Sequence, residues 1–489
     1  MIRQELEQAV RPTASSVDGR RFTFQCSLHG LELQPGGYVT IGEDLLGQVH
    51  ALEHAWVEGS DLAAATGLEG SPAVEGLTAA LARGDGLVLD AETQPFHDLA
   101  FEPARASTVS AWLAGTWSSG ARLDVGELLL EPDVRFALDA GGFNRHTFLC
   151  GQSGSGKTFA LGVLLEQVLL QTSIRVVILD PNSDFVRLGD VRDGIDADLA
   201  ARYGQATEGF SVLGQDTSAT DRLHVRFLDC GADEQAAVLR LDPIRDREEY
   251  GALLDMLDSG LEQSSASTAA LTERLRSAER EDVRTLGVRL RNLGIDRWPI
   301  WSLGDEHSVQ DLVAPGGPRA LVVDLGSLAT PGEKAIAAES VLAALWRNRS
   351  RREPVLVVID EAHNVCPREP ADEVTAIAAE CAGRIAAEGR KFGLYLLVST
   401  QRPQRVSELV VSQCDNLLLM RMTSTGDLAY VADVLSFAPK PLLDRATSFR
   451  IGESVVAGKA ASHPALVRFG PRISQEGGAD VPVSWAQPG

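Results

Sequence analysis

The stretch GQSGSGKT, from Gly151 to Thr158, matches the spacing G-x-x-x-x-G-K-[ST] of a phosphate-binding loop. The apolar segment HTFLC directly before it predicts a buried strand. After the loop, apolar residues recur with the spacing of one helix face, at Leu161, Leu164, Leu165, Val168 and Leu169. A strand, a loop and a helix in this order present backbone amides and the positive end of the helix dipole to an anion. The alternative, a Gly/Ser-rich turn with an incidental lysine, explains neither flanking element.

The residue types in this loop suit a nucleoside triphosphate. Gly151, Gly154 and Gly156 let the backbone form a nest of N–H groups around phosphate oxygens. Lys157 is predicted to reach the β- and γ-phosphates, and the Thr158 hydroxyl is predicted to ligate Mg²⁺. We expect the nucleotide to be held by Gly151, Gln152, Ser153, Gly154, Ser155, Gly156, Lys157, Thr158 and Phe159.

Composition limits the class of protein. A chain of 489 residues is too long for one core and predicts about three domains or subdomains. No apolar run approaches the length of about 18 residues that a membrane helix needs, and the first residues resemble no targeting segment, so we expect a cytoplasmic protein without a membrane partner. The formal net charge is −23, so any nucleic acid would have to meet a locally basic lining. Six scattered cysteines indicate buried thiols rather than a zinc site or disulfides.

The N-terminal part predicts a β domain over residues 1–120. Short strands with Gly/Pro turns between residues 20 and 55 indicate a small barrel. The Ala/Gly-rich text from about 60 to 115 is interpreted as an irregular elaboration of that barrel. Between 120 and 145 we expect two strands and a loop that leads to the strand before the phosphate-binding loop.

The remainder predicts an α/β core over residues 121–470 and a C-terminal tail over 471–489. Aliphatic runs predict buried strands at residues 174–180, 320–325, 355–359, 394–398 and 417–422. Such runs are typical of a parallel sheet with helices on both faces. Residues of about 190–315 interrupt the pattern and are interpreted as a helical insertion. The arginines in its second half either line a DNA channel or pair with neighbouring acidic side chains on a solvated face, and the second interpretation is favoured.

The run VLVVIDEAHN places two carboxylates at the end of a buried strand. Asp360 is predicted to belong to the Mg²⁺ shell, and Glu361 to polarise an attacking water. An acidic helix N-cap is the alternative. Asp180 and Asp184, after another strand, are expected near the nucleotide or a subunit boundary, because ligands bind at the carboxyl ends of parallel strands.

Three further polar residues are candidates for catalysis. Gln401 follows a buried strand and is predicted to sense the γ-phosphate, although polar residues in a surface turn are the alternative. Arg145 and Arg390 are candidates for arginines supplied across a subunit boundary, which can accelerate phosphoryl transfer by roughly 10³ to 10⁵. That role requires an oligomer, and surface salt bridges are the alternative role for each.

Taken in order, RHTFLCGQSGSGKT, LDPNSDF, ALVVDL, VLVVIDEAHN, EGRKFG and STQRPQ resemble the HerA branch of the HerA/FtsK ATPases. GGYVTIGEDLLGQVHAL is similar to the small HAS barrel that this branch shares with ATP synthase subunits. The resemblance implies a RecA-like P-loop NTPase sheet with an N-terminal barrel and a helical insertion. It gives catalytic roles to Lys157, Thr158, Asp360, Glu361 and Gln401 and trans-acting roles to Arg145 and Arg390. One departure is LDPNSDF, where the family commonly has His and Glu at the positions of Asn182 and Asp184.

The resemblance also implies a function. The implied protein is a hexameric ring that hydrolyses ATP to move along double-stranded DNA. A nuclease or effector protein would dock on the barrel, and the complex would act in DNA end processing or antiphage defence. The alternative is an ATP-binding ring scaffold that assembles or gates a partner effector without translocating DNA. A two-lobed DEAH-box helicase is a third interpretation of the letters DEAH, but the chain has one recognisable nucleotide core and STQRP in place of a Ser-Ala-Thr-like motif.

Overall fold

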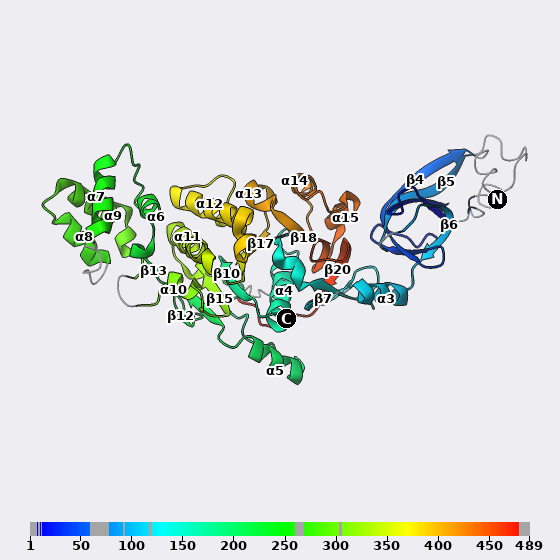
Figure 1. Ribbon diagram of the computed structural model, residues 1–489, viewed down its shortest axis with the longest axis horizontal. Helices are drawn as coiled ribbons and strands as arrows, with labels where there is room; N and C mark the ends of the chain where they lie inside the picture. The colour runs from blue at the N-terminus through cyan, green and yellow to red at the C-terminus, as the bar shows by residue number, and fades with distance from the viewer. Residues whose placement is uncertain are drawn as a thin grey trace, which may run out of the picture. The chain divides into compact units, whose positions relative to one another are not determined.

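A computed structural model describes Glu7, Val10 and residues 12–58, 78–90, 93–116, 120–259, 268–302 and 306–478. The chain forms two compact units, each built from separate stretches of sequence (Figure 1). The N-terminal unit consists of Met1–Asp139 with Leu418–Gly470, and the central unit consists of Ala140–Leu417 with the residues from Pro471 onward. The linear division into 1–120, 121–470 and 471–489 stays a prediction.

The N-terminal unit contains the expected small barrel. Six strands close in the order β1-β2-β5-β4-β3-β6. Phe22, Phe24, Val39 and Ile41 point into its core and are almost fully buried, as alternation along a strand with one buried face requires. The strands are β1 (Thr13–Ser16), β2 (Arg21–Ser27), β3 (Tyr38–Ile41), β4 (Leu45–Glu58), β5 (Thr78–Val88) and β6 (Phe96–Pro103).

The interpretation of residues 60–115 as irregular was wrong for the part that the structure describes. This region supplies β5, β6 and the helix α3 (Ala106–Thr116), while residues 59–77 lie outside the described residues. The strand β5 escaped notice because it contains Gly84 and Gly86, which are rare inside strands. Here a Cβ atom on Gly84 would lie 2.5 Å from the Phe24 ring, and one on Gly86 would lie 2.4 Å from the Phe22 ring. The glycines therefore make room for the aromatic core of the barrel.

The N-terminal unit also contains an antiparallel group of strands in the order β19-β20-β7-β8. It confirms the two strands expected between 120 and 145. Its elements are β7 (Arg122–Leu128), β8 (Arg135–Asp139), α14 (Thr425–Val434), α15 (Lys440–Asp444), β19 (Glu453–Gly458) and β20 (Ala465–Phe469).

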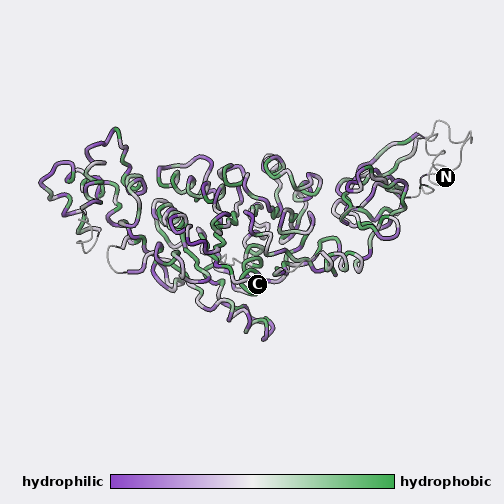
Figure 2. Tube along the Cα trace, viewed as in Figure 1, coloured by the Kyte–Doolittle hydropathy of each residue, from purple (hydrophilic) through white to green (hydrophobic). Residues whose placement is uncertain are grey.

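The central unit is built on a parallel sheet in the order β12-β11-β15-β10-β16-β17-β9. Its middle strands are buried along their whole length, so the prediction of a parallel sheet from uninterrupted aliphatic runs is confirmed. Figure 2 shows hydrophobic residues concentrated along these strands. The strands are β9 (His146–Cys150), β10 (Arg175–Asp180), β11 (Ser211–Gly214), β12 (Asp221–Arg222), β15 (Ala320–Asp324), β16 (Val355–Ile359) and β17 (Leu394–Thr400), and β18 (Cys414–Met420) follows β17 in the chain.

Helices cover both faces of this sheet because the chain reverses direction across it. From β9 to β10 the chain runs one way through α4 (Lys157–Gln171), and from β15 to β17 it runs back through α11 (Pro331–Arg347) and α12 (Glu373–Glu388) (Figure 1). Since such crossovers are right-handed, opposite directions place α4 on one face and the other two helices on the opposite face. The N-terminal end of α11 carries a Thr330–Glu333 capping box and has Pro331 in its first turn, both of which favour the start of a helix.

The insertion is helical, as expected, but the sheet does not stop there. β11 and β12 extend the edge of the central sheet, and β13 (Val225–Arg226) pairs with β14 (Trp301–Ser302). These strands are two to four residues long and are therefore too short to show a periodic pattern. The helices are α5 (Ala197–Ala206), α6 (Ala232–Val238), α7 (Arg247–Ser259), α8 (Thr268–Arg276), α9 (Glu281–Leu293) and α10 (Val309–Val313).

Three arginines in the second half of the insertion pair with acidic neighbours. Arg276 pairs with Glu273 at 2.8 Å, and Arg280 pairs with Asp282 at 2.6 Å. Arg289 contacts Glu249 at 2.5 Å and Asp246 at 3.1 Å. These pairs favour the interpretation of a solvated helix face over that of a DNA channel for this segment.

Residues 471–478, which the sequence assigned to a tail, form a C-terminal strap that packs on α4. The fully buried carboxylate of Glu166 accepts hydrogen bonds from the backbone N–H groups of Ile473 and Ser474, both at 2.8 Å, and from the Ser474 hydroxyl at 2.6 Å. The guanidinium of Arg472 is also fully buried and lies 3.4 Å from the same carboxylate. A Cβ atom on Gly162 would lie 2.5 Å from Arg472, so α4 needs a glycine there. The strap is therefore an integral part of the central unit.

Candidate functional site

The phosphate-binding loop lies where the sequence placed it, between β9 and α4. Gly154 and Gly156 have φ angles of 70° and 89°, in the left-handed region that favours glycine, and α4 begins at Lys157. The first backbone N–H groups of α4 therefore open toward the loop, as a phosphate site requires. Thr158 is the second residue of this helix. The Ser155 hydroxyl is buried and makes no hydrogen bond to any described residue.

Lys157 is buried and bound to groups from two other strands. Its Nζ donates to Asp360 Oδ1 at 2.7 Å and to the Ser399 hydroxyl at 3.0 Å, and it lies 3.1 Å from Glu361 Oε1. Burial by itself would lower the Lys157 pKa, but the two carboxylates outweigh burial and raise it. The lysine is therefore held charged within the site.

The order of the strands brings the predicted catalytic residues together. β17 lies between β9, which carries the loop, and β16, which carries Asp360 and Glu361. Gln401, directly after β17, therefore lies beside Glu361 and donates from Nε2 to its Oε1 at 2.7 Å. Glu361 has a φ of 42°, a costly conformation for a residue with a side chain. The structure thus assembles Lys157, Asp360, Glu361 and Gln401 at the carboxyl edge of the sheet.

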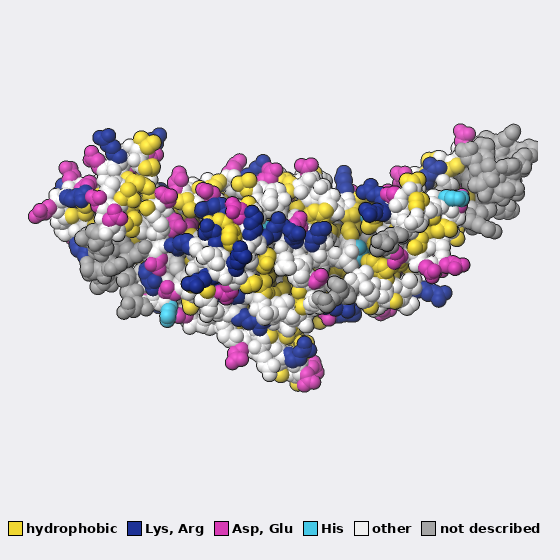
Figure 3. Space-filling model, viewed as in Figure 1, with side chains coloured by type: hydrophobic (Ala, Val, Ile, Leu, Met, Phe, Trp, Pro, Cys, Tyr) yellow, Lys and Arg dark blue, Asp and Glu magenta, His cyan; other side chains and the backbone are white. Residues whose placement is uncertain are grey.

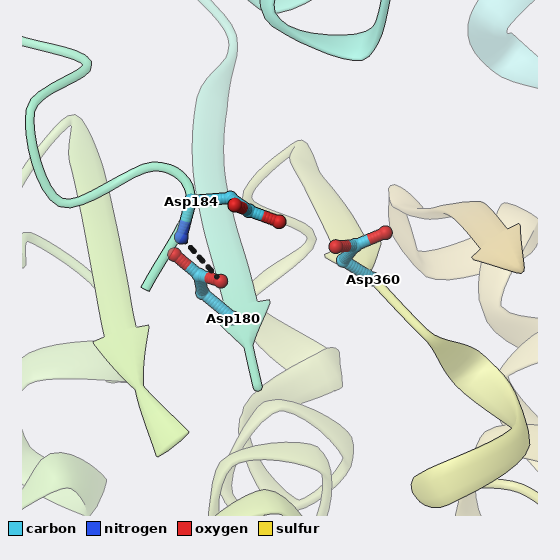
Figure 4. Close-up of side chains that lie close together, drawn as sticks. All are labelled: Asp180, Asp184 and Asp360. Atoms are coloured by element: carbon cyan, nitrogen blue, oxygen red, sulfur yellow. Dashed lines mark hydrogen bonds between the residues drawn. The ribbon is translucent and has the colours of Figure 1, made fainter. Parts of the chain in front are cut away.

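Three aspartates form a carboxylate cluster beside this group (Figure 4). One carboxylate oxygen from each of Asp180, Asp184 and Asp360 lies within 4.8 Å of the other two. Asp180 is fully buried and accepts backbone N–H groups from Asn182, Asp184 and Phe185, which shapes the turn after β10. Burial, reinforced by the charge of Asp360, raises the pKa of Asp180 to about 7 and that of Asp184 to about 6.

A magnesium ion suits this group of side chains. Asp360 Oδ2 is buried and has no hydrogen-bond partner among the described residues. An orphaned carboxylate oxygen at this depth is costly unless a ligand compensates it. Carboxylate and hydroxyl oxygens are the ligands that Mg²⁺ prefers, and Mg²⁺ commonly uses one or two carboxylates together with phosphates and water. The residues present therefore fit the predicted metal.

We expect Asp184→Asn to raise the melting temperature in metal-free buffer at about pH 8. In the unfolded chain an aspartate ionises near pH 4, so between about pH 4 and about pH 6 the folded protein binds more protons at Asp184, and stability falls as pH rises through that window. Asp184→Asn lacks the carboxylate and therefore does not lose this stability. Its melting temperature should exceed that of the wild type little near pH 4 and most near pH 8.

Millimolar Mg²⁺ should stabilise the wild type more than Asp184→Asn, because the ion compensates the crowded carboxylates. Melting curves with and without Mg²⁺ at the two pH values measure both effects, with the exposed Asp193→Asn as the matched control. A lower melting temperature for metal-free Asp184→Asn near pH 8 would contradict the expectation.

Arg145 and Arg390 lie together but away from Lys157. Arg390 Nη1 donates to Asp415 Oδ2 at 3.0 Å, and Arg145 Nε lies 3.7 Å from the same oxygen. Arg145 directly precedes β9, and Arg390 lies in η8 (Gly389–Phe392), which leads into β17. Both arginines therefore stand at the amino ends of strands whose carboxyl ends carry the phosphate-binding loop and Gln401. The side chains of Arg145, Arg390 and Asp415 are each about one third to one half exposed, so both arginines are accessible to a partner.

Three residues of the site were missed by the sequence interpretation. Ser399 binds Lys157; it directly follows the predicted strand 394–398 and lies inside β17 in the structure, but no role was assigned to it. His363 contacts Glu361 at 3.3 Å and Thr400 at 3.1 Å through Nδ1. Asp415 joins the two arginines. The one sequence signal that could have indicated such residues is a polar residue at the end of an aliphatic strand, and Ser399 and Thr400 both fit it.

Other sequence expectations can be checked directly. All six cysteines are buried, and none forms a disulfide, as expected. No helix among the described residues has both the length and the apolar character of a membrane span.

Comparisons with known proteins show which sequences this chain is similar to. A family model described as "Helicase HerA, central domain" matches residues 123–293, which include the phosphate-binding loop, Asp180 and Asp184. The DNA double-strand break repair helicase HerA of Pyrococcus furiosus is 26% identical over 394 residues, covering 71% of this chain and 69% of the relative. A probable helicase of Methanocaldococcus jannaschii is 25% identical over 386 residues, covering 73% of this chain and 69% of the relative.

Among solved structures, VirB4 of Thermoanaerobacter pseudethanolicus aligns with a TM-score of 0.49 and 17% sequence identity, covering 72% of this chain and 97% of that one. The family model covers the phosphate-binding loop with Lys157 and ends before Asp360, Glu361 and Gln401. The chain is therefore similar in sequence to HerA helicases, both over the HerA central domain and over about 70% of its length.

Proposed function

We propose that this protein is a hexameric motor that hydrolyses ATP to move along double-stranded DNA. The observation that supports it most is the group of Lys157, Asp360, Glu361 and Gln401, which has a separate side chain for each task in phosphoryl transfer. The similar Pyrococcus furiosus protein is named a DNA double-strand break repair helicase. The chain would work with a nuclease or effector protein docked on the N-terminal barrel, in DNA end processing or antiphage defence.

The roles follow from position. The loop amides and Lys157 would hold the phosphates, and the lysine would exchange its present carboxylate partners for phosphate oxygens. Thr158 and Asp360 would hold Mg²⁺, which when bound neutralises charge on the terminal phosphates. Glu361 would accept a proton from the attacking water, and the Gln401 amide would orient that water. Loss of the phosphate would then shift the loop that carries Arg402 and Arg405, two exposed arginines after Gln401.

A ring is proposed because the two candidate arginines cannot serve the site of their own chain. They lie at the opposite edge of the same strands, at the amino ends of β9 and β17, where a neighbouring copy could receive them. Figure 3 shows Lys and Arg side chains gathered around α12 and β17, although the chain as a whole is acidic. A local basic region of this kind suits contact with phosphates, either of a neighbour's nucleotide or of DNA.

Mixed subunits test the ring and the trans roles together. Lys157→Ala lacks the phosphate grip but keeps both arginines, and the double variant Arg145→Ala/Arg390→Ala keeps the grip but lacks the arginines. Each alone should be inactive, whereas mixtures should recover part of the ATPase rate if the arginines act across a boundary. Lys391→Ala, an exposed neighbour of Arg390, is the control and should stay active. Failure of all mixtures to recover activity, with only monomers in sedimentation with ATP and Mg²⁺, would overturn the ring.

Duplex DNA tests the motor. We expect ATP hydrolysis by the full chain to rise when duplex DNA is added, and displacement of a DNA-bound roadblock to require ATP. An ATP hydrolysis rate that does not change with duplex DNA but rises with a partner protein would favour the scaffold alternative.

A further inference from the structure

The two oxygens of the Glu361 carboxylate have partners of different kinds. Oε1 contacts Lys157 Nζ at 3.1 Å and Gln401 Nε2 at 2.7 Å, two flexible side chains that both have proposed roles at the phosphate. Oε2 contacts the backbone N–H of Gln401 at 3.4 Å and His363 Nδ1 at 3.3 Å. The partners of Oε2 are a backbone group and a mostly buried ring, so they are less free to move than the two side chains at Oε1.

His363 is itself anchored. Its Nδ1 lies 3.1 Å from the Thr400 hydroxyl, and that hydroxyl accepts the backbone N–H of Arg402 at 3.0 Å. We assign the proton to Nδ1, because a ring nitrogen without one would face the Glu361 carboxylate with its lone pair. The ring belongs to η7 (Ala362–Asn364) and is mostly buried, with 16% of its side chain exposed. It therefore connects the strand end of Glu361 to the strand end that carries Gln401.

We propose that His363 is a positioning residue, which holds Glu361 Oε2 so that Oε1 is presented to the attacking water once Lys157 and Gln401 have turned to the phosphate. The inference rests on the proposed role of Glu361 in hydrolysis. It also explains how Glu361 can keep a φ of 42°, since a strained backbone persists only where the surroundings fix it.

A role confined to folding is the competing explanation, because His363 also ties two loops together. The two explanations differ in what each substitution does. If the contact only stabilises the fold, its loss should lower the melting temperature and alter nucleotide binding. If the contact positions Glu361, its loss should lower kcat but leave the KM for ATP and the affinity for a fluorescent ATP analogue unchanged.

The test compares His363→Asn, His363→Gln and His363→Ala in the full chain. The asparagine amide places an N–H group near the position of Nδ1, whereas the longer glutamine places its amide near Nε2. We expect His363→Asn to keep most of the wild-type kcat, and the other two variants to lose about 10- to 100-fold, since a misplaced catalytic group commonly costs that much. Equal activity of the glutamine and asparagine variants, or full activity of His363→Ala, would overturn the proposal.

A double variant separates this idea from the proposed function. In a Glu361→Gln background, His363→Ala should cause almost no further loss, because the group that it positions is already removed. Losses that multiply would overturn the positioning role and leave the ATPase assignment intact. Absence of ATP hydrolysis by the folded wild type, with or without duplex DNA, would overturn the proposed function itself.

Discussion

Lys157→Ala is expected to abolish measurable ATP hydrolysis. The lysine is the buried cation in the loop, and its ammonium lies within 3.1 Å of both carboxylates of the DE pair. Without it, the charge that develops on the transferred phosphate loses a preorganised partner in a site of low dielectric constant, an effect that costs about 10³-fold or more in rate. Affinity for ATP should fall as well, because the lysine would contact the phosphates in the ground state.

The same substitution leaves Asp360 and Glu361 buried without their cation, so a lower melting temperature of the free protein is also expected. Activity loss must therefore be measured on material whose melting curve and circular dichroism show that it is folded. Lys459→Ala, at an exposed position of the N-terminal unit, is the matched control and should keep wild-type activity. A folded Lys157→Ala protein that still turns over ATP would contradict the assignment of the phosphate-binding loop.

Glu361→Gln is expected to bind ATP and to hydrolyse it about 10² to 10⁴ times more slowly than the wild type, the range that a general base contributes. The amide keeps one oxygen that can accept from Lys157 and Gln401, while its NH₂ group takes the place of the oxygen that faces the Gln401 backbone N–H and His363. It cannot take a proton from water. Single-turnover measurements with labelled ATP would separate the slow chemical step from binding and product release.

Glu369→Gln serves as the control for this prediction, because Glu369 is exposed and lies eight positions further along the chain. Should Glu361→Gln hydrolyse ATP at the wild-type rate, another carboxylate must act as the base. Asp184, which faces Asp360 in the cluster, is then the first residue to substitute.

Much of the central unit could be predicted from the sequence because its signals are local. Aliphatic runs such as VLVVI mark strands buried on both faces, and polar residues directly after them mark the carboxyl edge where ligands bind. Lys157, Asp360, Glu361 and Gln401 each belong to such a boundary. Their meeting depends only on strand order, which parallel α/β topology restricts strongly.

Other features depend on partners far along the chain. The glycines of β5 make sense only against the rings of Phe22 and Phe24. The short edge strand β11 is defined by its pairing with β15, more than one hundred residues later. Arg472 looks like an ordinary surface arginine until Glu166 is placed beside it. Such pairs leave no periodic trace in a single sequence.

The same applies to the smaller details of the site. Ser399 contacts Lys157 because β17 lies beside β9, and His363 contacts Glu361 because a short helical turn follows β16. Asp415 lies between two arginines because β18 begins beside the start of β9 and the end of η8. These side chains become visible only when the three-dimensional neighbours are known.

The strap also determines when the protein can fold during synthesis. Glu166 emerges from the ribosome early, yet the groups that neutralise and solvate its carboxylate, Arg472, Ile473 and Ser474, emerge only after the whole parallel sheet has been made. Until then the nascent core keeps an uncompensated acidic group at the helix that begins with Lys157, and incompletely packed cores are in general the ones that aggregate or require chaperones. A product that terminates at Phe469 would have every catalytic side chain and still lack a closed core.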